Sequence, residues 1–358
     1  TISQTDSATA SASIDQNGNS LTATVGQAAA TEGSSVEVVQ TGENSTVLAI
    51  QRGEETTALV SQTGGMANYA STNQDGNENT LTTTQSEGEF KVVYATQFGD
   101  GNNATHTQTD GSNNLSSTYQ VGTENTATIA QSGGEQNWVG AGQYGYENTA
   151  TTTQTGGEFN GATTSQTGNE NTATIAQSGG EWNRAGASQN GDSNSVTTTQ
   201  SGMWGVINST QIGDGNTVTS DQEGTDKVVS AAQTGDNNTL DTVQHAENNS
   251  GRVTVEQNGN GSNASITQGG IDNAASITQT GDDHISKIRQ DVYGNKNADN
   301  VANSIQTGSL NESDIWQRGP SDQNTTNVIQ GGSENQALVQ QDGGNTSFAT
   351  ITQSNIGN

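Results

Sequence analysis

Glutamine recurs at short, regular intervals along the whole chain. The series has thirty-one members, at positions 4, 16, 27, 40, 51, 62, 74, 85, 97, 108, 120, 131, 143, 154, 166, 177, 189, 200, 211, 222, 233, 244, 257, 268, 279, 290, 306, 317, 330, 341 and 353. From Gln51 onward every second interval has the same length as that from Gln51 to Gln62, whereas the intervals between them vary. A fixed length indicates a tight turn, and a variable one indicates a looser turn at the opposite edge. The repeating unit is therefore a pair of segments, about 23 residues long.

The residues before each glutamine follow a period of two. Both kinds of segment read Asn-x-Ala-x-Ile/Val/Thr-x-Gln, and Asn stands six positions before the glutamine in eighteen of thirty cases. A period of two predicts a strand with one inward face, and the Gly-rich stretches between segments predict turns. The predicted inward ladder includes Asn125, Ala127, Ile129, Gln131, Asn148, Ala150, Gln154, Asn160, Ala162, Gln166, Asn171, Ala173, Ile175, Gln177, Asn183, Gln189 and Gln200.

One such unit cannot bury its inner face alone, but stacked units can. The sequence therefore predicts an all-β solenoid of about 15.5 strand-turn-strand layers, built from two parallel, in-register sheets in a cross-β arrangement. Each glutamine would then lie above another and bond to it, which offsets the burial of its amide. We expect irregular repeats in residues 1–50, the regular solenoid in 51–353 and a C-terminal end in 354–358.

Composition narrows the alternatives. A hydrophobic content of 27% is typical of a disordered chain, but disorder does not require an inward pattern of period two. A globular multidomain protein is disfavoured because there is one proline and no compositional break. With a net charge of -29 and nine Lys and Arg, the chain is not expected to bind nucleic acid. No apolar run approaches the ~20 residues of a membrane-spanning helix.

Residues 97–108 resemble a known repeat. Gln97-Phe98-Gly99-Asp100-Gly101-Asn102-Asn103-Ala104, closed by Gln108, is similar to the curlin repeat, and residues 211–222 nearly repeat it. The resemblance covers about residues 51–353, although many layers have Glu at the second Gly and most have Asn in place of Ser on the first strand. It implies a subunit of curli, the functional amyloid of Gram-negative biofilms, with an unusually large repeat number. It further implies export through an outer-membrane pore and nucleation by a minor subunit at the cell surface.

No constellation of catalytic, cofactor-binding or metal-binding residues is expected. His106 falls on an inward position, whereas His245 and His284 are predicted in turns or at a strand start, so the three share no face. The pairs Asp100-Gly101 and Asp214-Gly215 resemble calcium loops, but the nonapeptide calcium repeat of β-rolls is missing. A β-helix lyase would need an acid–base cluster, which the sequence lacks.

Two features of the turns are informative. Glutamates recur four positions after a glutamine and predict two vertical acidic rows: Glu124, Glu147 and Glu170, and Glu135, Glu158 and Glu181. Such rows serve as a solvated edge or as a brake on assembly that protons or divalent cations release. Phe159, Trp182 and Trp204 each lie seven positions before a glutamine and predict an exposed aromatic row, which covers the turn or binds matrix components.

These observations predict a structural, non-enzymatic protein without cofactors that polymerises with itself at unpaired strand edges. The expected setting is the extracellular surface of a Gram-negative bacterium, where fibres support adhesion and cohesion of a biofilm. The alternative is a monomeric ice- or surface-binding protein with outward Thr-x-Thr arrays, at 80/82, 126/128, 149/151, 172/174 and 217/219. Those rows fail at Ile285/Lys287, Glu312/Asp314 and Gln336/Leu338.

Overall fold

The computed structural model describes residues 1–5, 9–28, 32–245, 250–291, 299–318, 323–342 and 346–355. The chain divides into two compact units, unit 1 (Thr1–Glu181) and unit 2 (Trp182–Asn358). All regular structure in the described residues is β-strand, with no helix among them. No described segment therefore forms an apolar helix of membrane-spanning length.

Unit 1 contains sixteen strands among its described residues, alternating between two parallel sheets. The odd-numbered strands are β1 (Ile2–Thr5), β3 (Thr22–Ala28), β5 (Thr46–Arg52), β7 (Tyr69–Asp75), β9 (Val92–Phe98), β11 (Leu115–Thr123), β13 (Trp138–Tyr146) and β15 (Gly161–Asn169). The even-numbered strands are β2 (Ser11–Asn19), β4 (Ser35–Glu43), β6 (Thr57–Thr63), β8 (Thr80–Ser86), β10 (Asn103–Thr109), β12 (Thr126–Ser132), β14 (Thr149–Thr155) and β16 (Thr172–Ser178).

Unit 2 repeats this plan, with fifteen strands in the part that the structure describes. One sheet holds β17 (Arg184–Asn190), β19 (Val206–Ile212), β21 (Val228–Thr234), β23 (Arg252–Asn258), β25 (Ala274–Asp282), β27 (Val301–Ser309), β29 (Thr325–Ser333) and β31 (Phe348–Ser354). The other holds β18 (Ser195–Met203), β20 (Thr217–Thr225), β22 (Thr239–Gln244), β24 (Asn263–Gln268), β26 (Ile285–Asp291), β28 (Glu312–Arg318) and β30 (Gln336–Asp342).

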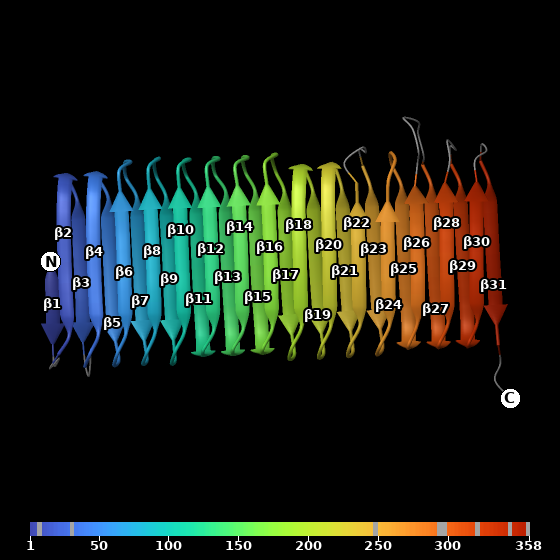
Figure 1. Cartoon of the computed structure of the whole chain (residues 1–358), viewed down its shortest axis with the longest axis horizontal. Helices are drawn as coiled ribbons and strands as arrows, with labels where there is room; N and C mark the ends of the chain where they lie inside the picture. Colours follow the sequence, from blue (N-terminus) through green and yellow to red (C-terminus); the bar gives the residue numbers. More distant parts are fainter. Residues whose placement is uncertain are drawn as a thin grey trace. The chain divides into compact units, whose positions relative to one another are not determined.

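Each strand pairs with the strand one layer away, so each sheet is parallel and in register. Gln97 lies opposite Gln120 and Gln120 opposite Gln143, and within each unit the strands of a sheet lie side by side with their turns at two edges (Figure 1). The predicted fold class, an all-β solenoid of two parallel sheets, is confirmed. The strands of residues 1–50 follow the same register, with Gln16 opposite Gln40. Of the expected C-terminal end, residues 356–358 lie outside the described part.

The core follows from the period of two. In β12, Ala127, Ile129 and Gln131 are buried while the residues between them are partly exposed. Alternate side chains of a strand point to opposite faces, so one face of each strand meets the other sheet and the other faces solvent. Small and branched apolar side chains therefore share the space between the sheets with buried glutamine, asparagine, serine and threonine.

A glycine two positions after the glutamine allows the tight turn. Gly145 has a φ of 125°. A Cβ atom on Gly145 would lie 2.0 Å from the carbonyl oxygen of Gly168 in the next layer. Only glycine fits this position without moving the backbone, because the turns of adjacent layers touch here.

Candidate functional site: side-chain ladders and turn edges

The glutamines of each sheet form a ladder of side-chain hydrogen bonds between layers. Gln97 Nε2 donates to Gln120 Oε1 at 2.9 Å, and Gln120 Nε2 donates to Gln143 Oε1 at 2.8 Å. Gln120 Nε2 also donates to the backbone carbonyls of Asn103 at 3.0 Å and Asn125 at 2.9 Å. Gln120 is fully buried, and these partners replace the water that its amide loses.

The same contact recurs in unit 2, where Gln189 Nε2 donates to Gln211 Oε1 at 3.0 Å and Gln200 Nε2 to Gln222 Oε1 at 3.0 Å. The structure places every predicted ladder residue inside its unit, with at most 2% of its surface exposed: Asn125, Ala127, Ile129, Gln131, Asn148, Ala150, Gln154, Asn160, Ala162, Gln166, Asn171, Ala173, Ile175 and Gln177 in unit 1, and Asn183, Gln189 and Gln200 in unit 2. The ladder therefore joins layers by side chains as well as by backbone.

The asparagines form a second ladder that closes the turns. Asn148 Nδ2 donates to the carbonyl of Gly168 in the next layer at 2.7 Å. Asn125 Oδ1 accepts from both the backbone N–H and the Nδ2 of Asn148, at 3.1 and 3.0 Å. Asparagine is suited to this position because its short amide reaches the turn of the next layer and the neighbouring asparagine at once.

Sequence reasoning missed that three other residues occupy the asparagine position. Lys91, Lys227 and His284 each stand six positions before a glutamine and are buried, with at most 1% of their surface exposed. His284 directly precedes β26, which agrees with a strand start, but its ring lies inside, and Nδ1 accepts from the N–H of Asn311 at 3.3 Å. The sequence signal that would have found all three is the set of residues that replace asparagine in the repeat.

The two buried lysines donate to backbone carbonyls. Lys91 Nζ donates to the carbonyls of Ser86 and Gln108, the latter at 3.2 Å, and Lys227 Nζ donates to that of His245. Desolvation lowers the pKa of Lys91 and of Lys227 to about 8. Carbonyl dipoles thus compensate only part of the hydration that each ammonium group loses.

His106 points inward, as predicted. Its Nδ1 lies 2.9 Å from Ser116 Oγ, whereas its Nε2 is buried without a hydrogen-bond partner among the described residues. Burial lowers the pKa of His106 to about 3. The imidazole is therefore neutral at physiological pH, and the pair has no access to solvent that a substrate would need.

The acidic rows lie on exposed turns. Glu124, Glu147 and Glu170 occupy equivalent positions of consecutive layers in unit 1, and their φ angles of 57°, 53° and 56° lie in the left-handed region. A residue with a Cβ in this region costs about 1 kcal/mol relative to glycine. Glutamate thus stands here despite both backbone strain and the charge of its neighbours.

The second acidic row, Glu135, Glu158 and Glu181, lies on the other edge of unit 1. Its members form parallel bridges from layer to layer, Glu135 with Glu158 and Glu158 with Glu181. All three side chains are exposed. Both rows are therefore vertical series of carboxylates, repeated at the layer spacing.

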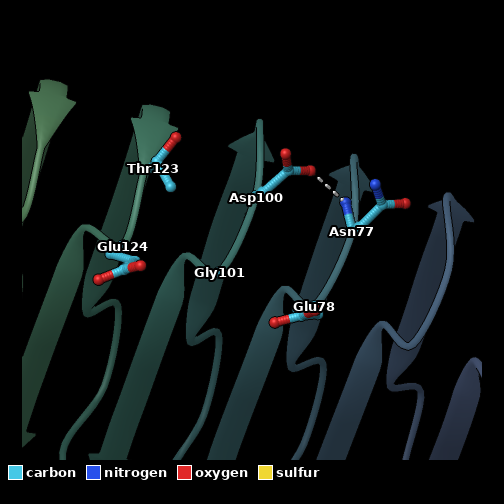
Figure 2. Close-up of a pocket in the computed structure, with 6 residues that line it drawn as sticks. All are labelled: Asn77, Glu78, Asp100, Gly101, Thr123 and Glu124. Atoms are coloured by element: carbon cyan, nitrogen blue, oxygen red, sulfur yellow. Dashed lines mark hydrogen bonds between the residues drawn. The ribbon is translucent and has the colours of Figure 1, made fainter.

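Tyr146 and a surface groove lie beside residues of the first acidic row. Hydrogen bonding to Glu147, with the charge of Glu124, raises the pKa of Tyr146 to about 12. A groove of about 420 Å³ lies at the same edge and is lined in part by Glu124. Within it, Asp100 Oδ1 accepts a hydrogen bond from the backbone N–H of Asn77 at 2.8 Å (Figure 2). The residues that line the groove are Asn77, Glu78, Asp100, Gly101, Thr123 and Glu124.

The described residues contain no group of three or more His, Cys, Asp or Glu placed to hold a metal ion.

The aromatic row shares the strained backbone position of the glutamates. Phe159 in unit 1 and Trp182 and Trp204 in unit 2 have φ angles of 57°, 60° and 59°. Trp182 and Trp204 are each 53% exposed, whereas Phe159 is only partly exposed. The two tryptophans at this turn position therefore present about half of their surface to solvent.

Outward threonines form a column in unit 1. Thr82, Thr105, Thr128, Thr151 and Thr174 lie opposite one another on β8, β10, β12, β14 and β16. In unit 2 the equivalent column begins with Thr197 and Thr219 and then meets Asp241. In unit 2 the regular threonine array therefore ends after Thr219.

Part of the chain matches a known protein family. Residues 235–270, which span β22 to β24 and the start of the next turn, match the family model of the curlin associated repeat. No curated protein matches the chain significantly. The match lies in unit 2 and includes Gln244, Gln257 and Gln268 of the ladder.

Proposed function

We propose that the protein is a structural, non-enzymatic subunit that assembles end to end into extracellular, curli-like amyloid fibres of a biofilm matrix. The observation that carries the proposal is the glutamine ladder. Gln120 donates a side-chain hydrogen bond to Gln143 and accepts the equivalent one from Gln97. A layer of a second copy that presents the same glutamine would bind in the same way. The match to the curlin associated repeat supports this function.

Assembly would proceed at strand edges. β31 pairs with β29 on one side, and no described strand pairs with its other side. Free backbone N–H and C=O groups at such an edge accept a strand of another chain, as in β-augmentation. The fibres would form at the surface of a Gram-negative cell and support adhesion and cohesion, with a minor nucleating subunit and an outer-membrane pore as partners.

Electron microscopy of the purified protein tests assembly. We expect unbranched fibres after incubation at micromolar concentration, and a variant with Gln341→Leu and Gln353→Leu, which alters the last layer's ladder, should form them more slowly. Gln341 is 9% exposed, and Gln353 Nε2 donates to the carbonyl of Gln336. Equal rates for both proteins would contradict the role of the ladder at the growing edge.

The threonine column of unit 1 favours a second candidate, an ice- or surface-binding function. Repeated threonines on one face of a sheet present hydroxyl and methyl groups at regular spacing, with Thr128 opposite Thr151 and Thr151 opposite Thr174. Inhibition of ice recrystallisation by the monomer, lost when Thr105, Thr128 and Thr151 are all changed to Lys, would support this candidate. A protein that forms fibres and leaves ice growth unchanged would exclude it.

A further inference from the structure

Tyrosines form a diagonal stripe on the outer face of the odd-numbered sheet of unit 1. Tyr69, Tyr94, Tyr119 and Tyr144 are evenly spaced in the sequence. The residue opposite Tyr69 in the next layer is Val92, and Tyr94 lies two positions beyond it. Each tyrosine is therefore displaced by two positions from the one before and stays on the same face, so the stripe crosses β7, β9, β11 and β13 obliquely.

The rings of the stripe form two close pairs and remain open to solvent. The centroids of Tyr69 and Tyr94 are 5.7 Å apart and those of Tyr119 and Tyr144 are 5.8 Å apart, and Phe98 adds a ring 5.8 Å from Tyr119. Tyr94, Tyr119 and Tyr144 are 48%, 40% and 45% exposed. The structure thus presents two pairs of partly exposed rings along one diagonal, with Phe98 beside Tyr119.

The neighbours of the stripe leave the rings uncovered. The residues opposite Tyr94, Tyr119 and Tyr144 in the next layer are Ser117, Gly142 and Thr167, all small. Strands β9, β11, β13 and β15 contain no charged residue, although the chain has a net charge of -29. On β7, Asp75 lies opposite Phe98, and Arg52 forms an ion pair with Asp75 at 3.6 Å. Along β9 to β15 the surface around the stripe is therefore uncharged and rich in hydroxyl groups, and beside it the charge of Asp75 on β7 is balanced by Arg52.

We propose that the stripe binds a single chain of an uncharged, linear β-linked polysaccharide. One face of a pyranose ring carries C–H groups that pack on aromatic rings, and its rim carries hydroxyls that bond to Ser, Thr and Tyr hydroxyls. A neutral face gives no ion pair to an anionic ligand. A stable protein interface buries about 800 Å² on each partner, which is broader than a line of single rings, so a sugar chain fits this surface better than a second copy.

Equilibrium dialysis with cellohexaose tests the proposal, because the protein is retained whether it is monomeric or fibrous. We expect excess sugar on the protein side, with a dissociation constant on the order of 0.1–1 mM. Changing Tyr94, Tyr119 and Tyr144 together to Ser should weaken binding about tenfold or more. The matched change of the same three residues to Phe keeps the rings and should leave binding within about threefold of the parent.

The controls separate the stripe from other effects. Changing Thr105, Thr128 and Thr151 to Ser on the opposite sheet should leave cellohexaose binding unchanged, and a hexamer of galacturonate should not bind. The proposal is overturned if the parent retains no cellohexaose, or if the Ser variant, with an unchanged circular dichroism spectrum, binds as the parent does. It is also overturned if the parent binds no sugar and the Ser variant alters only the lateral association of copies. Binding by the stripe does not require end-to-end assembly, so failure of the fibre proposal would leave this result intact.

Discussion

Gln120 Nε2 donates a hydrogen bond of 2.8 Å to Gln143 Oε1, the side chain directly opposite it in the next layer. The amide of Gln143 continues the series to Gln166 at 2.9 Å. Each glutamine is thus donor to one neighbour and acceptor from the other, so one surface of a layer presents a ladder donor and the opposite surface presents the matching acceptor. This property makes a stack extendable, because a layer from another chain is bonded like a layer of the same chain.

The ladder should matter more than the outer face. Changing Gln166, Gln177 and Gln189 to Leu removes the ladder hydrogen bonds that Gln143 and Gln154 donate and that Gln211 accepts, at a cost of roughly 1 kcal/mol or more each. Changing Thr172 and Thr174 to Ser alters only outward positions and should change stability by less than about 0.5 kcal/mol. Denaturation in guanidinium, followed by circular dichroism, measures both, and equal midpoints for the two variants would mean that the inside and outside were assigned wrongly.

The glutamate rows should slow assembly at low ionic strength. Protonation, or bridging by millimolar divalent cation, removes repulsion between stacked carboxylates, so fibres should form faster at pH 5 than at pH 8 in low salt. The test variant changes Glu124, Glu147, Glu170, Glu135, Glu158 and Glu181 to Gln and adds six acidic residues to exposed positions within 290–330, which keeps the net charge. Thioflavin fluorescence gives the rates. If that variant responds to acid as strongly as the parent, bulk charge and not the rows controls assembly.

His106 should make unit 1 less stable in acid. Its folded pKa is about 3 and its ordinary value is 6.5, so between these values the unfolded chain binds more protons than the folded one. Stability therefore falls as the pH decreases from 6.5 toward 3, by roughly 1.4 kcal/mol per pH unit. Thr83 and Thr152 hold the same position in β8 and β14, so His106→Thr fits and should lose this dependence. Urea midpoints at pH 4 and pH 7 measure the difference. If the variant loses as much stability as the parent between pH 7 and pH 4, His106 is not the source of the acid dependence, and the prediction is wrong.

At neutral pH, the buried charge of Lys91 should lower the free energy of unfolding. Its pKa is lowered from 10.5 to about 8, so the unfolded chain binds more protons between those values and stability rises with pH across that window. Below pH 8 both states are protonated and the penalty of burying the charge is present in full. Lys91→Asn restores the ladder residue and should raise stability at pH 7 by about 1–3 kcal/mol and flatten the slope above pH 8. The exposed Lys287→Asn serves as a control with little effect, and a lower midpoint for Lys91→Asn would contradict this interpretation.

The regular part of the fold could be predicted from the sequence because one physical rule acts on every layer. Glutamine and asparagine must lie above their equivalents to be satisfied, so the spacing alone identifies the positions of Gln120, Gln143 and Asn148. Lys91 and His284 lack the amide that marks the interior, so composition points them outward, whereas their spacing, six positions before Gln97 and Gln290, is the signal that places them inside.

The surface was harder to predict than the interior. The glutamates were expected on the turns, but the left-handed backbone at Glu147 depends on how the turns of adjacent layers meet, which only the assembled stack defines. Successive tyrosines of the stripe, such as Tyr69 and Tyr94, are spaced two positions wider than the layer register that sets Tyr69 opposite Val92. The stripe therefore does not align in the repeat and emerges only when the strands are set side by side.

Diffraction from aligned fibres tests the central claim most directly. If copies join by the bonds that join layers, strands run across the fibre axis and the pattern shows a meridional reflection near ~4.8 Å and an equatorial one near ~10 Å. A protein that stays monomeric for days at micromolar concentration, with a strand-rich circular dichroism spectrum and no such reflections, would contradict end-to-end assembly.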